Sequence, residues 1–329
     1  MKLFKREKKN KITGRTTVRE YMNDWLENVK KPVLKPSSYD RVEQSLKYQI
    51  YPFIGDIRID KLRTDEIQKM VNSAAESSYS TAKKSYNNIS SGLELAVRKG
   101  LINRNPAAAV VMPRKLDFKE VSCYTEEQIQ AITEEATNTY KNGRYKYRYG
   151  YAIILLLNTG MRSGELTYLK WKDVDLVKRY IYVHGNVSSV KSRSGGGYEL
   201  IEQETPKTSK SIRYITLNDN AVKALKKLKA IIGEDSVRVV ETQNGNILSP
   251  RKIYSTMTSI LERAEIERIP SPVHALRHTF ATMLIRKGVD IKVISELLGH
   301  ADVSTTMGIY YHTIEAQKRE AVQQLEDFY

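Results

Sequence analysis

The chain has 329 residues, enough for two or three domains, and its 54 Lys and Arg against 38 Asp and Glu give a formal net charge of +16. Such a surplus favours a polyanionic partner. The single cysteine, Cys123, excludes an intrachain disulfide and a thiolate zinc cluster. The longest apolar run, Tyr151 to Leu157, is far shorter than the roughly 20 residues of a membrane helix, and no secretion signal is visible, so we expect a cytoplasmic protein.

The first part of the chain divides into a charged tail and a helical region. Residues 1–16 are basic with almost no apolar content, which predicts a disordered tail. From residue 17 to 112 the apolar residues recur at helical spacing and predict an all-helical domain. Its inward faces are expected to carry Val18, Tyr21, Met22, Trp25 and Leu26; Val42, Leu46, Ile50 and Phe53; Leu62, Ile67, Met70 and Val71; and, in a fourth helix from Ser90 to Leu101, Leu93, Leu95 and Val97.

Residues 113–123 interrupt this periodicity and predict a polar, basic linker. Thr125 and Gln128 then have the spacing of a capping box, so a second domain is expected over residues 124–312. Lys83 and Lys84 in the helical domain are candidates for contact with DNA phosphates, although a solvated helix face explains them nearly as well. Arg114 and Lys115 in the linker are further candidates.

The second domain begins with helical signals and continues with strands. A buried helix that ends at Thr159-Gly160 is followed by Met161-Arg162-Ser163-Gly164-Glu165-Leu166, in which Glu165 is about one turn from Arg162 and could orient its guanidinium. The alternative is a surface arginine at the start of an ordinary helix. Tyr180–Val183 and Ser211–Leu217 predict strands, separated by a Ser/Gly-rich excursion over Ser188–Gly197 and the segment Thr205-Pro206-Lys207-Thr208.

The span from Ser271 to His312 holds four of the five histidines. Ser271 and Pro272 predict the N-cap and first turn of a helix that ends at Gly288, and Asp290 caps a second helix that ends at Gly299, just before His300. The inward face of the first helix carries Leu276, Phe280, Met283 and Leu284. On its other face His274 and Arg277 lie three residues apart, so one imidazole and one guanidinium point together.

The motifs H-x-x-R, L-G-H and T-T followed by a tyrosine, with T-G-x-R-x-x-E-L upstream, resemble the signature of the tyrosine recombinases, the integrases of phages and conjugative elements. The resemblance covers roughly Thr17 to His312 and is most specific from Arg162 onward. It implies a mainly α protein with a small antiparallel β-sheet, in which a helical core-binding domain precedes a mixed α+β catalytic domain. It also implies a bacterial enzyme that integrates and excises a mobile element.

The resemblance also implies a catalytic set, which is Arg162, Lys207, His274, Arg277, His300 and Tyr310. In this interpretation the two arginines neutralise the scissile phosphate in place of a metal ion, and no cofactor is expected. His274 is the acid–base partner and His300 donates a hydrogen bond to the phosphate. Lys207, at a hairpin turn, protonates the departing 5′ oxygen, with Lys210 and Lys191 as substitutes. The tyrosine forms a 3′-phosphotyrosyl link that keeps the bond energy, so rejoining needs no ATP.

The nucleophile is a choice between Tyr310 and Tyr311. Adjacent helical positions differ by about 100° in direction, so only one of them can face the arginines. Tyr310 matches the family ending Y-x-H, with His312 two positions later, and is favoured. Either tyrosine could instead lie in the core or at an interface.

Three alternatives to a recombinase are to be compared with these residues. A zinc hydrolase would use His274 and His278 at i, i+4, but Ala275 stands where its glutamate is needed and Arg277 would repel a cation. A non-enzymatic DNA-binding regulator explains the charge but not the catalytic set. A type IB topoisomerase shares the chemistry and is expected to act as a monomer.

The last segment, residues 313–329, predicts a helix whose apolar stripe is Ile314, Ala321, Val322, Leu325 and Phe328. Such a stripe must be buried on its own domain or on a neighbouring subunit. We expect a homotetramer on double-stranded DNA with recombination core sites, in which this tail is exchanged between subunits. Directionality or DNA-bending proteins are the expected accessory partners.

Overall fold

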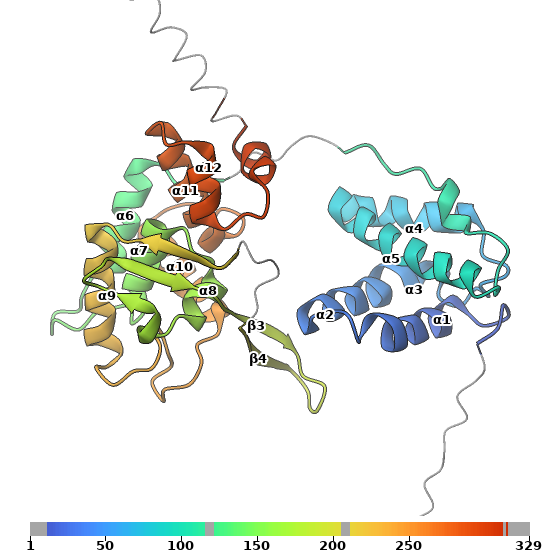
Figure 1. The fold of residues 1–329 in the computed structure, drawn as a ribbon, viewed down its shortest axis with the longest axis horizontal. Coiled ribbons are helices and arrows are strands. Elements are labelled where there is room, and N and C mark those ends of the chain that lie inside the picture. Colours follow the sequence, from blue (N-terminus) through green and yellow to red (C-terminus); the bar gives the residue numbers. More distant parts are fainter. Residues whose placement is uncertain (1–11, 116–121, 205–210, 312–313, 315–329) are drawn as a thin grey trace, which may run out of the picture. The chain divides into compact units, whose positions relative to one another are not determined.

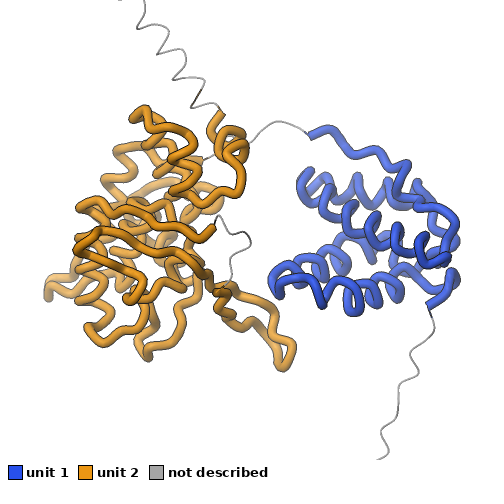
Figure 2. The backbone as a smooth tube through the Cα atoms, in the orientation of Figure 1, with its two compact units in different colours: residues 1–118 blue, residues 119–329 orange. Residues whose placement is uncertain are grey.

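The computed structural model describes residues 12–115, 122–204, 211–311 and 314. The chain forms two compact units, residues 1–118 and residues 119–329, shown in different colours in Figure 2. Each unit has its own hydrophobic core. Among the described residues, no helix is long and apolar enough to cross a bilayer.

Unit 1 is entirely helical in its described part (Figure 1). Its elements are α1 (Val18–Trp25), the π-helical turn η1 (Leu26–Lys30), α2 (Pro36–Ser45), the π-helical turn η2 (Leu46–Ile50), α3 (Tyr51–Ile54), α4 (Thr64–Ser77), α5 (Tyr79–Arg98) and the 3₁₀ turn η3 (Pro106–Ala109). Helix α1 packs closely on α5, because a Cβ at Gly92 would lie 2.4 Å from Met22 Sδ, and Tyr21 Oη donates to Gly92 O at 2.8 Å.

Two details of unit 1 differ from the sequence prediction. Phe53 is 45% exposed, whereas Ile54 is buried in its place, because the wider π-helical turn η2 shifts the inward face by one residue. The fourth helix begins at Tyr79 and not at Ser90. Its first turns bury Ala82 and Ser85, which give no apolar periodicity, and Ser78 caps it by accepting from Thr81 N.

Unit 2 combines helices with two small sheets (Figure 1). Its elements are α6 (Glu126–Ala136), α7 (Gly150–Thr159), α8 (Ser163–Tyr168), the 3₁₀ turn η4 (Trp171–Asp173), β1 (Val174–Asp175), β2 (Tyr180–Val183), β3 (Asn186–Lys191), β4 (Tyr198–Gln203), β5 (Arg213–Thr216), α9 (Asp219–Ile232), α10 (Pro250–Arg263), α11 (Pro272–Arg286) and α12 (Ile291–Leu298). The predicted class, mainly α with a small antiparallel β-sheet, is confirmed.

The strands form two antiparallel sheets, β1-β2-β5 and β3-β4. Ile181 of β2 pairs with Ile215 of β5, and both are buried in the main core. The strand predicted at 180–183 is confirmed, and the one predicted at 211–217 is shorter, Arg213–Thr216. The expected Ser/Gly-rich excursion is instead largely a hairpin: β3 and β4 pair from Asn186–Gln203 to Lys191–Tyr198, and the glycines occupy only its turn.

The predicted helix caps of α6 and α12 are present in the structure, and that of α11 is present only in part. The capping box at the start of α6 is confirmed, as is the cap of α12, where Asp290 accepts from the N–H groups of Lys292 and Val293. Gly299 ends α12 in the left-handed conformation, with φ 67°. Ser271 occupies the N-cap position of α11, but its side chain makes no capping hydrogen bond because its backbone is left-handed, with φ 54°.

Candidate active site

Arg162 and Glu165 lie at the start of α8. Gly160 ends α7 in the left-handed conformation, and the chain then turns into α8, with Arg162 as its N-cap residue. Arg162 N donates to Glu165 Oε2 at 2.9 Å, and Arg162 Nη1 donates to Glu165 Oε1 at 2.8 Å. Glu165 is buried, whereas the Arg162 side chain is 39% exposed. The buried Glu165 therefore holds the guanidinium of Arg162 in place, and the exposed part of this guanidinium remains accessible to an anion.

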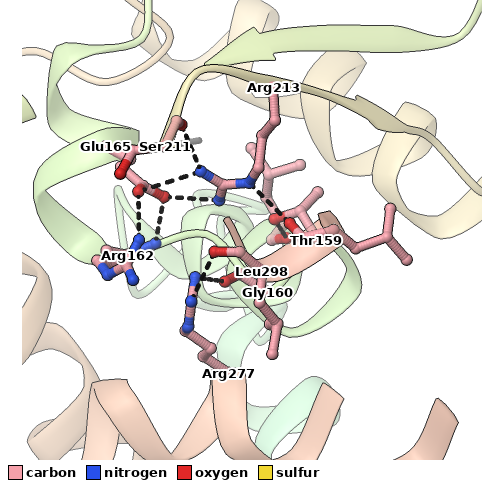
Figure 3. A network of polar contacts seen from close by, with 10 residues as sticks. Thr159, Gly160, Arg162, Glu165, Ser211, Arg213, Arg277 and Leu298 are labelled. Atoms are coloured by element: carbon pink, nitrogen blue, oxygen red, sulfur yellow. Dashed lines mark hydrogen bonds and ion pairs between the residues drawn. The ribbon is translucent and has the colours of Figure 1, made fainter. Parts of the chain in front are cut away.

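A third arginine, Arg213, holds the other side of Glu165 (Figure 3). Its Nη2 donates to Glu165 Oε2 at 2.9 Å and its Nη1 to Oε1 at 3.2 Å, while its Nε donates to Leu297 O at 2.7 Å. Burial alone would raise the pKa of Glu165, but the charges of Arg213 and Arg162 and their hydrogen bonds lower that pKa to about 2. The carboxylate stays ionised and links α8 to β5.

Arg277 of α11 is the buried arginine of the site, with 2% of its surface exposed. Its Nη1 donates to Gly160 O at 2.9 Å and its Nη2 to Leu298 O at 2.6 Å, so it joins the end of α7 to the end of α12 (Figure 3). Burial, with Arg162 nearby, lowers the pKa of Arg277 to about 9. The guanidinium is still charged at neutral pH.

Three histidines adjoin the arginines. The rings of His274 and His278 meet edge to face with centroids 4.6 Å apart, and His300 Nδ1 lies 2.7 Å from Thr306 Oγ1. Burial lowers the pKa of His278 to about 4, assisted by His274 and Arg277. Burial and the site's arginines lower the pKa of His300 to about 4, and burial followed by Arg277 and Arg162 lowers that of His274. All three imidazoles are therefore neutral near pH 7, each with one donor and one acceptor nitrogen.

Tyr310 contacts this group from the helical residues 303–311. It is 3% exposed, and its Oη lies 2.9 Å from His278 Nδ1. Burial raises the pKa of the Tyr310 phenol well above its ordinary value, with the thiol of Cys123 in the same direction and the charge of Arg277 opposing. Tyr311 is 56% exposed and does not share this environment. Of the two adjacent tyrosines, Tyr310 is the buried one, and its hydroxyl contacts His278.

Two residues of this arrangement were missed from the sequence. His278, considered only as a zinc ligand, contacts the Tyr310 phenol, which we had expected of His274. The sequence signal for His278 was its i, i+4 spacing from His274, which places the two side chains next to each other on one helix face. Arg213 was not singled out at all. In β5 it shares the buried face with Ile215, and a buried arginine in a strand needs an anionic partner.

The other sequence candidates are either outside the described residues or not part of this cluster. Lys207, Lys210 and the tail other than Ile314 fall outside the described residues. Lys191, the other substitute, ends β3 on an exposed position. The DNA-binding candidates are all exposed in unit 1: Lys83 and Lys84 on α5, and Arg114 and Lys115 after η3.

The zinc hydrolase alternative finds no support in this geometry. Within residues 12–115, 122–204 and 211–311, no group of three or more His, Cys, Asp or Glu side chains is placed to hold a metal ion.

Known proteins share both the sequence and the fold. Residues 123–317, more than half of the chain, match the phage integrase family. This chain belongs to that family. A second match, to the N-terminal SAM-like domain of phage integrases, covers residues 17–75. A tyrosine recombinase of Thermosipho africanus is 30% identical over 316 residues, which are 94% of this chain and 95% of the relative. The protein is thus a tyrosine recombinase, a site-specific enzyme of DNA breakage and rejoining.

Two solved integrase structures show the same fold. The Tn1549 transposon integrase, solved in complex with transposon right end DNA, has a TM-score of 0.75 at 20% identity and covers 93% of this chain and 99% of its own. A lambda integrase tetramer bound to a Holliday junction has a TM-score of 0.63 at 21% identity. The match covers 87% of this chain and 78% of the lambda integrase chain. At such identities the likeness concerns the fold of this integrase-family chain.

Proposed function

We propose that this tyrosine recombinase integrates and excises a mobile element through a 3′-phosphotyrosyl intermediate on Tyr310, without metal or ATP. Residues 17–112 are assigned to core-site binding and residues 124–312 to catalysis. The observation that carries the proposal is the convergence of Arg162, Arg277 and the three neutral histidines around one buried tyrosine. Nothing in a non-enzymatic regulator requires such an arrangement.

The arginines have separate tasks in this proposal. Arg162, exposed at the start of α8 and held by Glu165, binds a non-bridging oxygen of the scissile phosphate directly. Arg277, fixed by two carbonyl oxygens, adds positive charge beside it. Both guanidinium groups are already held in place in the free protein. Little reorganisation of the site is therefore required as charge develops on the phosphate. Glu165 acts through Arg162 and is a positioning residue.

The proton transfers follow from the neutral imidazoles. As Tyr310 Oη attacks phosphorus, its proton passes to a neutral imidazole, and His278 Nδ1 is the nearest one in this structure at 2.9 Å. His274 and His300 are then available to bond the phosphate oxygens. The bond from phosphorus to the 5′ oxygen breaks, and Lys207 gives that oxygen its proton. The assignment of Lys207 rests on the sequence resemblance.

The proposed assembly is a homotetramer on paired core sites, in the bacterial cytoplasm. Its support is the apolar stripe of the tail and the lambda integrase tetramer, which is solved on a Holliday junction. Ile314, the one described residue of the tail, packs against the cluster that contains Tyr310. An exchanged tail would therefore start beside the nucleophile and could link its position to the neighbouring subunit. Lys83, Lys84, Arg114 and Lys115 are proposed to contact DNA phosphates.

The test is covalent trapping on a nicked duplex that carries the core site of the element next to the gene. The wild-type protein should form a protein–DNA adduct in excess EDTA and without nucleotide. Strict dependence on magnesium, or cleavage that leaves no adduct, would contradict the mechanism. The stoichiometry of the bound species separates a recombinase, with several protomers on paired sites, from a monomeric topoisomerase.

A further inference from the structure

A hollow of about 840 Å³ lies beside the C-terminal part of α9. Its walls are the connection between α6 and α7, the last turns of α9, and Gln243. The side chains that characterise it are Tyr140, Arg144, Tyr145, Lys146, Arg148 and Lys227. Four cations therefore face one hollow, and no carboxylate belongs to its lining.

The connection that presents these groups is an ordered turn. Tyr140 N donates to Arg144 O at 2.8 Å, Gly143 N to Tyr140 O at 2.9 Å, and an antiparallel bridge joins Thr139 to Tyr145. Gly143 adopts φ 78°, a left-handed conformation that glycine tolerates best. Arg144 follows the turn and is exposed. The rim of the hollow is thus preformed.

The fold anchors Arg148 in the wall of the hollow. Arg148 donates from Nη1 to Ile231 O at 3.4 Å and from Nη2 to Ile232 O at 3.3 Å, so its charge lies at the negative end of the α9 dipole. Its Nε is buried and has no hydrogen-bond partner among the described residues. Within residues 12–115, 122–204 and 211–311, no carboxylate forms an ion pair with Arg144 or Lys227.

The hollow is separate from the candidate active site. None of its lining residues belongs to the cluster around Arg162 and Tyr310. β5, which carries Arg213, leads into the N-terminal end of α9, whereas the hollow is at the other end of a 14-residue helix, about 20 Å away. Figure 1 shows α9 at one edge of unit 2 and the β3–β4 hairpin at the opposite edge.

We propose that this hollow binds the phosphate backbone of a DNA segment other than the core site at the active site, which rests on the proposed recombinase function. Arginine, lysine and tyrosine side chains are the usual partners of DNA phosphates, and apart from Ala230 and Ile231 the lining is made of polar side chains, most of them donors. Four cations with no carboxylate among the lining residues favour a partner that carries a continuous row of negative charge, and flanking DNA is such a partner.

The test compares two double variants of the full-length protein. Arg144→Gln/Lys227→Gln removes two positive charges from the hollow. Lys146 is left unchanged because its charge also helps to lower the pKa of Glu135. Lys178→Gln/Lys226→Gln is the matched control, since both lysines are exposed and neither lines the hollow. Each protein is titrated at several salt concentrations against a short duplex with only the core site and against a long duplex with flanking DNA.

On the long duplex, the hollow variant should bind more weakly than the control, and its slope of log K against log salt should be smaller by about 1 to 2, since each phosphate contact contributes about 0.9. On the short duplex, affinity and adduct yield should match those of the control. Equal slopes for the two variants on the long duplex would overturn the proposal. If no variant and no wild-type protein forms an adduct on the short duplex, the recombinase mechanism fails, while the slopes still decide on the hollow.

Discussion

The Oη atom of Tyr310 lies 2.9 Å from Nδ1 of His278, and the tyrosine is 3% exposed. The proposed nucleophile is therefore packed on α11 among Ala281, Ile285, Ile294 and Leu298 in the free protein. Burial raises the pKa of its phenol, which makes the residue a weak nucleophile in this state. DNA must bring the phosphate to Tyr310, or Tyr310 to the phosphate, before attack.

The first prediction concerns the choice of tyrosine. Tyr310→Phe should abolish the covalent adduct on a nicked core-site duplex, because it removes the attacking oxygen. Tyr311→Phe should retain it, since Tyr311 is 56% exposed. Gel separation of adducts measures both. The reverse pattern would assign the chemistry to Tyr311. As a control for folding, Tyr310→Phe should lower the free energy of unfolding by only about 1 kcal/mol, the value of one hydrogen bond.

The second prediction concerns stability against pH. His278 and His300 have pKa values lowered to about 4 by burial first, from an ordinary 6.5, so the unfolded chain binds more protons than the folded one between these values. The free energy of unfolding should therefore fall as the pH is lowered from about 6.5 to about 4. Denaturant titrations at several pH values measure this.

The control for the pH prediction is His278→Gln, in which part of that dependence should disappear. Glu165 titrates in a different window, because the charges of the arginines overcome the effect of burial and bring its pKa to about 2, below its ordinary 4.5. Its contribution is present above pH 4.5 and is lost as the pH falls toward 2. An unchanged slope between pH 6.5 and 4 in the histidine variant would contradict the proposed origin.

The third prediction concerns Arg213 as a positioning residue. Arg213→Met leaves Glu165 with one arginine instead of two, which should destabilise the protein by about 3 kcal/mol. Cleavage should also fall, by roughly a hundredfold, because Arg162 loses its fixed support. The rate is measured on folded protein with the substrate in excess, and Arg213→Lys should restore part of it.

A matched control for Arg213 is Arg238→Met. Arg238 also pairs with a glutamate through two nitrogens, at 2.7 Å from Nη2 to Glu202 Oε1, but it is not part of the arginine–histidine cluster. This variant should lose stability and keep its cleavage rate. Equal rate losses in both variants would mean that Arg213 affects catalysis only through stability.

The fourth prediction concerns Lys207 as the general acid. Lys207→Ala should slow cleavage of an ordinary 5′-bridging oxygen, which needs a proton to leave. It should slow cleavage of a 5′-bridging sulfur much less, since a thiolate leaves without protonation. Single-turnover rates on both substrates give the comparison. Equal defects would exclude Lys207, and Lys210 and Lys191 would then be tested in the same way.

The fifth prediction concerns the tail. Because Ile314 packs against the cluster around Tyr310, the informative truncation ends after Ile314 and keeps that contact. The truncated protein should bind a single core site almost normally but fail to form a tetramer on paired sites. Sedimentation of the complexes shows this directly. Unfolding of the truncated protein, or loss of single-site binding, would show that the tail packs on its own subunit.

Signals a few residues apart determined much of the local structure. The caps at Asp290 and Gly299 and the capping box at Thr125 were readable because each satisfies backbone groups of its own helix. The family motifs likewise located Arg162, Arg277 and Tyr310 without coordinates. The prediction of local structure was still incomplete. The π-helical turn before α3 moves the buried face from Phe53 to Ile54, and the spacing of the apolar residues does not predict such a turn.

The tertiary structure alone decided which side chains meet. Glu165 and Arg213 are 48 residues apart, and His278 and Tyr310 are 32 residues apart. Neither separation in sequence specifies a contact. The fold brings Arg213 of β5 to Glu165 of α8, and Tyr310 of residues 303–311 to His278 of α11. The lowered pKa values of the histidines also arise only there, since burial and neighbouring guanidinium groups exist in the folded chain and not in the sequence.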